Sequence, residues 1–460
     1  MNYISVGPLT SKSVTNHRPR ILSNWSNAKR IFWLLLSYFK TRHLRFTSRD
    51  DLERYQAKRL NQFLHRLSAR SPYFADYQGV PLKRWPAMDK KDLIASFDVM
   101  NTVNLRIDDV IAMALQSERS RDFTPTMGDV TVGLSSGTSG HRGLFAVSSR
   151  EQAQWAGVIL AKMLPRGIFK AQQIAMFLRA NSNLYTAVRT RWLNFTFYDL
   201  FDPFTRHIEC LNGIPPSILI APAQVLRQLA LATRDGRLQI APMRVISVAE
   251  VLEPQDRALI REVWGEVHEI YQATEGLVAS SCSYGVLHLN EEHLYIEADW
   301  VDREQRRFRP IITDFNRFTQ PIVRYHLNDI LIAREAPCQC GLFTRSLEGI
   351  EGRNDDMLLL PGQEQDCITV FADLLSRVFV RSLPLDADYR LIQTAAATLH
   401  LYANVGSTSC LQQLKNDLDS TLENLGVAVD SINWKLSLSI PAFDPTVKRR
   451  RIARKQWDES

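Results

Sequence analysis

A turn rich in serine, threonine and glycine has the composition of a phosphate-binding site. It consists of Ser135, Ser136, Gly137, Thr138, Ser139 and Gly140, and it follows an alternating run from Val130 to Leu134 that predicts a strand. Glycines let the backbone approach an anion, and hydroxyl and N–H groups can donate to its oxygens. Because no Lys follows the last glycine, the turn is not a P-loop. Considered alone, a turn of this kind is more often a surface linker.

A second group of residues could bind a metal ion. It consists of Cys282, His288, Cys338 and Cys340. Three thiolates and one imidazole would satisfy a closed tetrahedral zinc site that joins two loops. The Cys-x-Cys pair is tighter than the common Cys-x-x-Cys, and buried free thiols with a surface histidine are an equal alternative. His293 and His326 are reserve ligands.

The elements that must hold these residues alternate between helices and short strands. Apolar runs typical of buried strands recur at 174–178, 217–221 and 244–248, with helical stretches between them. Leu60, Phe63, Leu64 and Leu67 follow the i, i+3, i+4, i+7 spacing of a helix. This order predicts an α/β fold, with a large multi-sheet α/β body whose buried strands are largely parallel.

A different pattern begins after Glu351. Leu399 and Leu401 alternate as in a strand, and a leucine series then follows a helical period that ends at Gly426. The series consists of Leu411, Leu414, Leu418, Leu422 and Leu425. The pattern predicts a separate, small α+β domain at the C-terminal end.

Composition and charge exclude several classes of protein. The chain has 460 residues, of which 45% are apolar, and only six cysteines, so it can form a large core and is not a disulfide scaffold. The net charge of +7 is concentrated at the ends, because residues 1–50 hold nine Lys and Arg against one acid and residues 446–460 hold six against two. The body between them is mildly acidic. We therefore expect no nucleic-acid partner.

The N-terminal region contains the longest apolar run. Residues 1–24 are polar and predict a loose arm, whereas residues 25–46 contain the run Ile31–Phe39 followed by basic residues. The run is about half the roughly 18 residues that a spanning helix needs, and no small-residue cleavage site follows it. Two alternatives remain, an interfacial helix on an anionic membrane and a helix packed on the body, and the second is favoured.

Five motifs in a fixed order resemble those of one enzyme superfamily. They are SSGTSGHRG at 135–143, VAEVLE at 248–253, YQATEG at 271–276, PIVRYHLNDI at 321–330 and GRNDDMLLL at 352–360. A Lys near the C-terminus completes the set. From about residue 51 to Lys455 the sequence resembles the adenylate-forming (acyl- and aryl-CoA synthetase) superfamily. Within it, the sequence is similar to the branch of phenylacetate:CoA ligase and related adenylating synthetases.

The resemblance implies an ATP-dependent acid–thiol ligase that uses Mg²⁺. A small-molecule carboxylic acid would attack the α-phosphate of ATP, releasing pyrophosphate and leaving an acyl-AMP, whose acyl group CoA or the phosphopantetheine of a carrier protein would accept. The implied domains are a basic arm at 1–45, an N-terminal domain at 46–352 and a mobile C-terminal domain at 353–460. The alternatives are transfer to a non-thiol acceptor and a degenerate nucleotide-binding protein with a membrane or partner role. The implied location is the cytoplasm, with peripheral contact at the inner membrane surface left open.

The same resemblance implies roles for individual residues. The nucleotide ligands would be Ser135, Ser136, Gly137, Thr138, Ser139, Gly140, Arg142, Ala249, Glu250, Tyr271, Gln272, Asp329 and Arg353. Among them the Ser/Gly turn would hold the β- and γ-phosphates, Tyr271 would stack on adenine and Asp329 would accept the ribose hydroxyls. Thr274 would reach the α-phosphate, Glu275 would hold Mg²⁺ and Lys448 would neutralise the reacting groups, while Asp355 would be the hinge.

Outside this set of motifs, the same residues have ordinary structural explanations. Glu275 could be a turn acid, Asp329 a cap and Tyr271 a core aromatic. For the cysteines and His288, similar positions in some relatives favour zinc over free thiols. An acyl pocket for an aromatic or medium-chain acid would be lined by Tyr185, Trp192, Phe195, Phe197 and Phe201.

Three positions depart from the superfamily pattern. Arg142 stands in place of a Lys, and Asn328 and Val447 each stand in place of a Gly. A planar guanidinium is not equivalent to an ammonium point charge, whereas Asn tolerates left-handed backbone angles. The basic residues after Lys448 are predicted to form a solvated tail. They are Arg449, Arg450, Arg451, Arg454 and Lys455.

Overall fold

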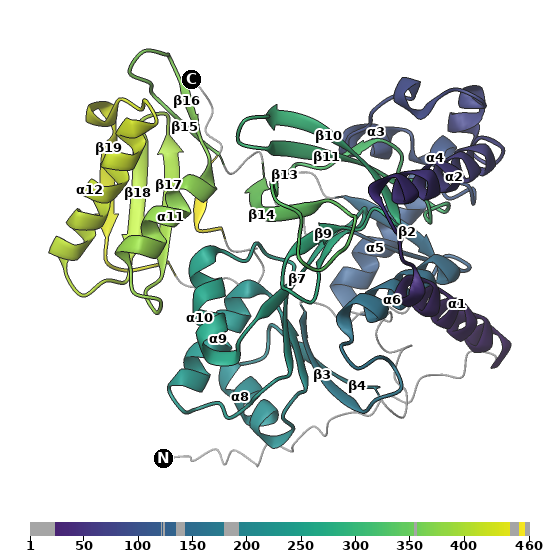
Figure 1. Ribbon diagram of the computed structural model, residues 1–460, viewed down its shortest axis with the longest axis horizontal. Coiled ribbons are helices and arrows are strands. Elements are labelled where there is room, and N and C mark those ends of the chain that lie inside the picture. Colours follow the sequence, from purple (N-terminus) through teal and green to yellow (C-terminus); the bar gives the residue numbers. More distant parts are fainter. Residues whose placement is uncertain are drawn as a thin grey trace, which may run out of the picture.

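The computed structural model contains a large α/β body and a small α+β domain (Figure 1). The described residues are 24–120, 122, 125–134, 143–178, 193–353, 357–441 and 450–455. The small domain has its own core, whose buried apolar side chains come from residues 358 to 452. The predicted fold class, an α/β body with a separate C-terminal domain, is therefore confirmed.

One sheet extends through the body in the order β10-β11-β13-β14-β9-β8-β7-β6-β5-β3-β4, with β12 beside β11 (Figure 1). Five of its strands are mutually parallel: β3 (Gln172–Leu178), β4 (Leu193–Asp199), β5 (Ile218–Ala221), β6 (Arg244–Val248) and β7 (Val267–Ala273). Their two faces pack into different cores, since Ile174 and Met176 contact the cluster that contains α6, while Ala175 and Phe177 contact the cluster of α8, α9 and α10. The bounds of these helices are α6 (Ser149–Met163), α8 (Phe204–Gly213), α9 (Ala223–Arg234) and α10 (Pro254–Trp264). Burial on both faces explains why β3, β5 and β6 are largely apolar runs.

Beyond β7 the sheet is antiparallel, so the expectation of a largely parallel body was wrong for this half. β7 and β8 (Gly276–Ser281) are separated only by Thr274 and Glu275, which is too short for the crossover that parallel strands require. The remaining antiparallel strands are β9 (Leu287–Leu289), β10 (Leu294–Asp302), β11 (Arg307–Asp314), β12 (Tyr325–His326), β13 (Asp329–Ala333) and β14 (Ser346–Arg353).

The region before the sheet is mostly helical. Its elements are α1 (Asn24–His43), α2 (Arg49–Ser68), η1 (Pro72–Tyr77), η2 (Leu82–Arg84), α3 (Lys90–Ala95), α4 (Phe97–Met100), α5 (Ile107–Ser120) and the hairpin of β1 (Val130–Leu134) and β2 (Leu144–Ser148). α2 confirms the predicted helix, and it buries Phe63, Leu64 and Leu67. α1 packs against α6, where a Cβ added to Gly157 would lie 2.3 Å from the carbonyl oxygen of Leu34. Within the described residues, no helix has the length and apolar content to cross a membrane.

The small domain is built on a four-stranded sheet in the order β19-β18-β17-β20. Its elements are β15 (Leu358–Leu360), β16 (Ile368–Val370), α11 (Ala372–Ser382), β17 (Tyr389–Ala395), β18 (Thr398–Ala403), α12 (Thr408–Asn424), η4 (Val429–Ser431), β19 (Asn433–Ser437) and β20 (Ile452–Arg454). The predicted leucine series buries Leu411, Leu414, Leu418 and Leu422 of α12. Gly426 follows the helix with φ +86°, which a side chain would disfavour.

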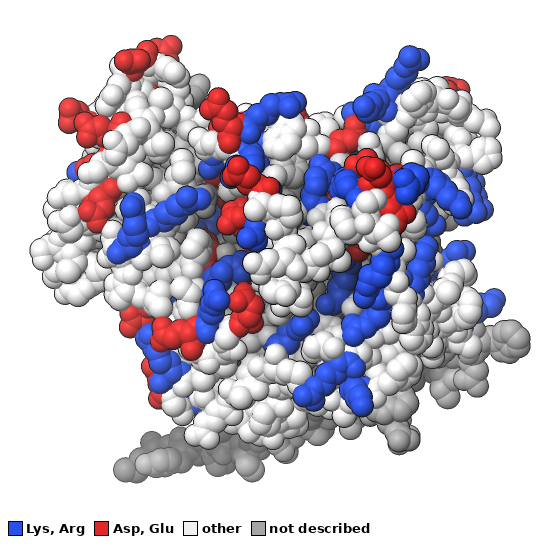
Figure 2. Space-filling view, in the orientation of Figure 1, with Lys and Arg blue, Asp and Glu red and all other residues white. Residues whose placement is uncertain are grey.

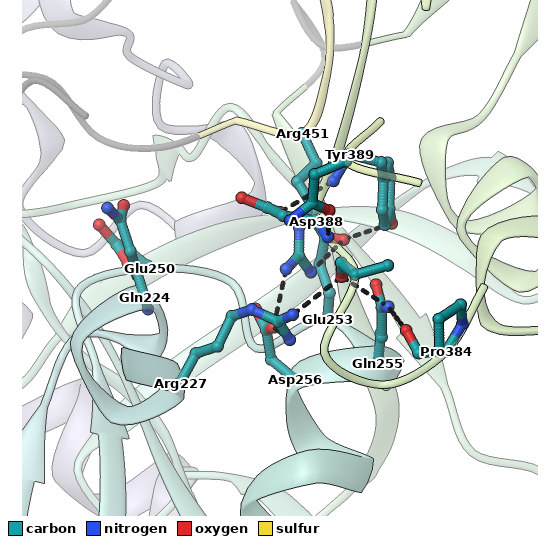
Figure 3. A network of polar contacts seen from close by, with 12 residues as sticks. Gln224, Arg227, Glu250, Glu253, Gln255, Asp256, Pro384, Asp388, Tyr389 and Arg451 are labelled. Atoms are coloured by element: carbon teal, nitrogen blue, oxygen red, sulfur yellow. Dashed lines mark hydrogen bonds and ion pairs between the residues drawn. The ribbon is translucent and has the colours of Figure 1, made fainter. Parts of the chain in front are cut away.

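A buried cluster of charges joins the small domain to the body, and it corrects the prediction for Arg451. The Arg451 side chain is 2% exposed, and it makes ion pairs with Asp256 at 2.8 Å, Glu253 at 3.1 Å and Asp388 at 3.2 Å (Figure 3). Its guanidinium also lies 4.9 Å from the ring centre of Tyr389. Arg451 is therefore an interdomain anchor, whereas Lys455 is exposed as predicted. The tail prediction failed here because the three acids come from the start of α10 and the start of β17, far away in sequence.

Candidate functional site

Several of the predicted nucleotide ligands lie where strands end in the middle of the sheet. Ala249 and Glu250 directly follow β6, and Thr274 and Glu275 directly follow the parallel neighbour β7. Carboxyl ends of neighbouring parallel strands meet at one edge, which is where open α/β sheets bind ligands. Ala249 has φ +66°, an uncommon backbone conformation for a residue with a Cβ. The sheet therefore brings the VAEVLE and YQATEG motifs together at one edge.

Tyr271 and Asp329 are in direct contact. The Tyr271 hydroxyl donates to Oδ2 of Asp329 at 2.5 Å, and Tyr271 is 9% exposed. Asp329 begins β13, and its backbone is paired in register with Arg353 at the end of β14. The two residues expected at adenine and ribose thus come from strands on either side of the site and share one hydrogen bond. Arg353 is beside them in the main chain, although its side chain lies outside the described part of the structure.

Thr274 and Glu275 form the turn of the β7–β8 hairpin. The hydroxyl of the buried Tyr325 donates to the Glu275 carboxylate, and burial, followed by this acid, raises the pKa of Tyr325. The hydroxyl therefore remains a proton donor at neutral pH. At Thr274 the carbonyl accepts from Nη1 of Arg317 at 2.8 Å. The turn is held from two sides, which leaves the Glu275 carboxylate in a fixed position, partly exposed.

A buried polar chain connects this turn to the strand that follows the predicted phosphate turn. Arg317 donates to Oε1 of Gln320 at 3.1 Å, and Gln320 in turn bonds the backbone of Leu144 and Ala146 in β2. Oε1 of Glu151, at the start of α6, accepts from the backbone N–H groups of Phe318 and Thr319. The sequence analysis did not find Arg317, Gln320 or Glu151. None of the three belongs to a motif, and the burial of Arg317 and Gln320 is not visible in a sequence.

Two other predicted nucleotide ligands, Glu250 and Gln272, differ in their surroundings. Oε2 of Glu250 accepts from the backbone N–H of Gln224 at 3.1 Å, at the start of α9, where a carboxylate is favoured by the helix dipole (Figure 3). Gln272 in β7 is exposed. Glu250 thus fixes the loop after β6 against α9, and Gln272 presents its amide to solvent at the edge of the site.

Some predicted residues lie outside the described part of the chain. They are Ser135, Ser136, Gly137, Thr138, Ser139, Gly140, Arg142, Asp355 and Lys448, together with the acyl-pocket candidates Tyr185 and Trp192. Their roles remain predictions. Of the other acyl-pocket candidates, Phe195 packs against the α6 core and Phe201 is 46% exposed.

Asp314 is a buried acid next to the β7–β8 turn. A Cβ added to Gly276 would lie 3.6 Å from its Oδ2, and its Oδ1 accepts from the backbone N–H of Asn316 at 2.8 Å. Burial raises the pKa of Asp314 to about 6, and the hydrogen bond from Asn316 lowers it less than burial raises it. Asp314 therefore loses its proton close to neutral pH, in contact with the turn that carries Glu275.

Asp314→Asn is expected to remove a pH-dependent loss of stability. A carboxyl whose pKa is higher in the folded state binds more protons folded than unfolded, so the free energy of unfolding falls as pH rises from about 4 to about 6. At pH 7 the variant should be more stable by up to about 3 kcal/mol, from the difference between the usual value of 3.8 and about 6. Urea unfolding at pH 4.5 and 7 measures this. Asp302→Asn, in a similar turn at the other end of β10 and β11, is the control, and an equal gain there would contradict the assignment.

The four predicted metal ligands form one cluster. Their ligand atoms all lie within 4.8 Å of one another, with Sγ of Cys282 3.8 Å from Sγ of Cys338 and Sγ of Cys340 3.3 Å from Nε2 of His288. Ligands at 2.0 to 2.3 Å from a tetrahedral zinc would be about 3.5 to 3.8 Å apart. Nδ1 of His288 lies 3.2 Å from the carbonyl oxygen of Thr344, a contact that leaves Nε2 facing the thiols. The residues present therefore fit a closed, structural zinc site.

The two reserve histidines are not part of the cluster. Nε2 of His293 is 3.2 Å from the hydroxyl of Thr41, and His326 lies in β12, paired with Ile311. Among the residues that the structure describes, only the four predicted ligands come together as a metal-binding group of histidines, cysteines and acids.

The comparisons with known proteins concern the fold. No family model matches the chain, and no curated protein matches it by sequence. A 2-hydroxyisobutyryl-CoA ligase in its postadenylation state with 2-HIB-AMP matches with a TM-score of 0.63 and 18% identity, over 88% of this chain and 89% of that chain. The same ligase in an open conformation with 2-HIB-AMP and CoA gives a TM-score of 0.54 at 16% identity, over 87% and 90%. An acyl acid amido synthetase gives 0.52 at 12% identity, over 84% and 86%.

Proposed function

The chain has the fold of the adenylate-forming ligases, and on this premise we propose that it activates a carboxylic acid with ATP. The observation that carries the proposal is the meeting of three motifs at one sheet edge, where Tyr271 bonds Asp329 and the β7–β8 turn presents Glu275. A nucleotide cleft needs an aromatic face for the base and a carboxylate for the ribose hydroxyls, which Tyr271 and Asp329 would supply. The product would be an acyl-AMP, whose acyl group then passes to a thiol.

The proposed chemistry divides into two half-reactions. An oxygen of the acid's carboxylate forms a bond to the α-phosphorus of ATP while the bond to the bridging oxygen of the β-phosphate breaks, so pyrophosphate leaves. The sulfur of CoA or of a carrier phosphopantetheine then bonds to the acyl carbon, AMP leaves with the electron pair, and the thiol proton passes to solvent. Higher similarity to the postadenylation state than to the open state of one ligase supports assigning the arrangement held by Arg451 to a postadenylation state.

The residues would divide this work as follows. Asp329 accepts hydrogen bonds from the ribose hydroxyls, Tyr271 contacts the base, and Thr274 donates to the α-phosphate. Glu275, held by Tyr325, is the acid that would bind Mg²⁺, which supplies positive charge to the phosphate oxygens during the transfer. Lys448 and the turn 135–140 would supply the remaining positive charge and N–H donors. We expect the acid to be aromatic or medium-chain, because aromatic residues between the phosphate turn and the adenine motif would line its pocket.

ATP–pyrophosphate exchange tests the proposal without requiring the acceptor. Purified full-length protein with Mg²⁺ would be assayed with a panel of aromatic, hydroxyaromatic and fatty acids. We expect exchange that depends on one class of acid, followed by AMP release with CoA. If exchange occurs and the acyl group passes to an amine instead of CoA, the acceptor is not a thiol. Absence of exchange with every acid, although ATP binds, would contradict the proposal and favour a degenerate nucleotide-binding protein. We place the protein in the cytoplasm, with peripheral contact at the inner membrane surface as the alternative.

We further propose that the cysteine cluster holds one structural zinc ion. All four tetrahedral positions are taken by Cys282, His288, Cys338 and Cys340, which leaves none for a substrate. The cluster joins the β8–β9 turn to the loop between β13 and β14, at the end of β8 opposite Glu275.

The metal content of the purified protein measures this directly. We expect about one zinc per chain, and its loss in Cys338→Ser combined with Cys340→Ser, with a lower melting temperature because the two loops are no longer joined. Cys210→Ser combined with Cys410→Ser changes two exposed cysteines outside the cluster and serves as the control. A wild-type protein without zinc after refolding with the metal, or equal zinc loss in the control, would contradict the site.

A further inference from the structure

α1 is packed on the body through one face and exposes a second, apolar face. Leu34 and Tyr38 are buried against α6, whereas four large side chains on the other side remain exposed. They are Ile31 (52% exposed), Phe32 (58%), Leu36 (46%) and Phe39 (39%). Residues 32, 36 and 39 follow the i, i+4, i+7 spacing, so they share one side of the helix. The helix therefore packs on the body, as the favoured alternative predicts, and it also exposes apolar side chains on a second side.

The body extends this apolar face. Phe169, after α6, is 57% exposed, and its ring centre lies 6.2 Å from that of Phe39 in a stacked arrangement. Phe169 therefore extends the side of α1 that carries Phe32, Leu36 and Phe39, and this grouping is more than the scattered single residues of an ordinary surface. The apolar face is defined here as Ile31, Phe32, Leu36, Phe39 and Phe169.

Positive charge surrounds the apolar face. Residues 24–48 and 164–172 contain no Asp or Glu, and the exposed basic side chains beside the face include Lys29, Lys40, Arg166 and Lys170. In the lower right of Figure 2, where α1 lies, the coloured side chains are mostly blue. A basic border around exposed Phe and Leu is typical of helices that lie in the plane of an anionic membrane surface.

A cavity at the C-terminal end of α1 continues the basic surface. It has a volume of about 520 Å³, and its lining includes Arg42, His43, Arg45 and Lys162. His43 stacks on Phe39, so the cavity adjoins the apolar face. Its one acid, Glu292, is paired with Lys162 at 2.5 Å, while Arg42 and Arg45 donate to backbone carbonyls, which leaves their charge uncompensated by these contacts. The lining suits a phosphate headgroup.

We propose that the apolar face and its basic border bind the surface of an anionic lipid bilayer, with a lipid headgroup at the cavity. Charge distinguishes this occupant from two others. A second copy would bring one basic border against another, which repels. Residues 1–23 contain three Lys and Arg and no acid, so they offer no complementary charge. The membrane contact is separate from the nucleotide site and does not depend on the proposed reaction.

Co-sedimentation of the full-length protein with vesicles tests the proposal. We expect binding to phosphatidylcholine vesicles that contain phosphatidylglycerol, and weaker binding at high salt or without the anionic lipid. Phe32→Ser, Leu36→Ser and Phe169→Ser together should lower the partition coefficient by about ten-fold or more, since three inserted side chains are lost. Lys29→Glu with Lys170→Glu should lower it at low salt only, since these two charges contribute long-range attraction.

A matched control uses exposed apolar residues elsewhere in the body. Val99→Ser, Val103→Ser and Ile214→Ser change side chains of 41 to 56% exposure outside the apolar face, and they should leave binding unchanged. Equal melting temperatures would show that each variant is folded. The proposal is overturned if the intact protein does not bind the anionic vesicles at low salt, or if the triple variant of the apolar face binds as well as the control. It is also overturned if sedimentation velocity shows that the same three residues hold two chains together. Full competition with the vesicles by an acidic protein partner in the co-sedimentation assay would overturn it as well.

Discussion

Glu275→Gln is expected to lower acid-dependent ATP–pyrophosphate exchange by about 10² to 10³-fold, as removal of one well-placed charged group from a transfer site typically does. The change keeps the shape of the side chain and an oxygen that can accept from Tyr325, so the β7–β8 turn should be preserved. What is lost is the negative charge that would hold Mg²⁺ at the phosphates. Initial exchange rates at several Mg²⁺ concentrations measure the effect.

Glu262→Gln is the matched control for this prediction. Glu262 is an exposed acid on α10, away from the sheet edge, and the same change there should leave exchange within about two-fold of wild type, because isolated surface changes have small effects. Tyr325→Phe should have an intermediate effect, with a higher Mg²⁺ requirement, since it removes only the hydrogen bond that orients Glu275. Equal rates for Glu275→Gln and Glu262→Gln would remove Glu275 from the proposed machinery.

The parts of the fold that were predictable are those that depend on local patterns. β3, β5 and β6 are buried on both faces, so each is an apolar run that can be read directly. α2 and α12 bury one stripe each, which gives a helical period. The change from parallel to antiparallel strands depends instead on the length of the link between β7 and β8. Thr274 and Glu275 form a two-residue turn between these strands, and no local apolar pattern marks it.

The candidate site was predictable as a list of residue types but not as a set of contacts. Spacing indicated that Cys282, His288, Cys338 and Cys340 could form one metal site, yet their distances depend on pairing between β8, β9 and β14. The contact of Tyr271 with Asp329 likewise joins two strands 58 residues apart. Arg317 and Gln320 belong to no motif, and Arg451 lies in a basic run typical of a tail. Long-range polar pairs leave no periodic signal in a sequence, so the structure was needed to find them.

Arg451 is the position where substitution should most affect stability. Arg451→Ala would leave the acids of Glu253, Asp256 and Asp388 without this partner in a site where the Arg451 and Asp256 side chains are 2% and 6% exposed. Removing one partner of a buried ion pair typically costs about 3 to 5 kcal/mol, because the remaining charge stays buried. The cost should appear in the interface between the domains, since β20 on one side and α10 on the other lose their connection. We expect a lower urea midpoint and a larger radius of gyration by small-angle X-ray scattering.

Two comparisons make this result specific to the buried cluster. Arg454→Ala removes a partly exposed arginine at the end of β20, three residues after Arg451, and should change the midpoint little. Adding Glu253→Gln to Arg451→Ala should recover part of the loss, because it removes one of the acids left unpaired while an amide oxygen can still accept from the Tyr389 hydroxyl. If Arg451→Ala and Arg454→Ala unfold at the same urea concentration, the cluster does not hold the domains together. If the interface is loosened, exchange should fall with the fraction of molecules in which the small domain is docked, because the proposed first half-reaction would use Lys448 of the small domain together with residues of the body.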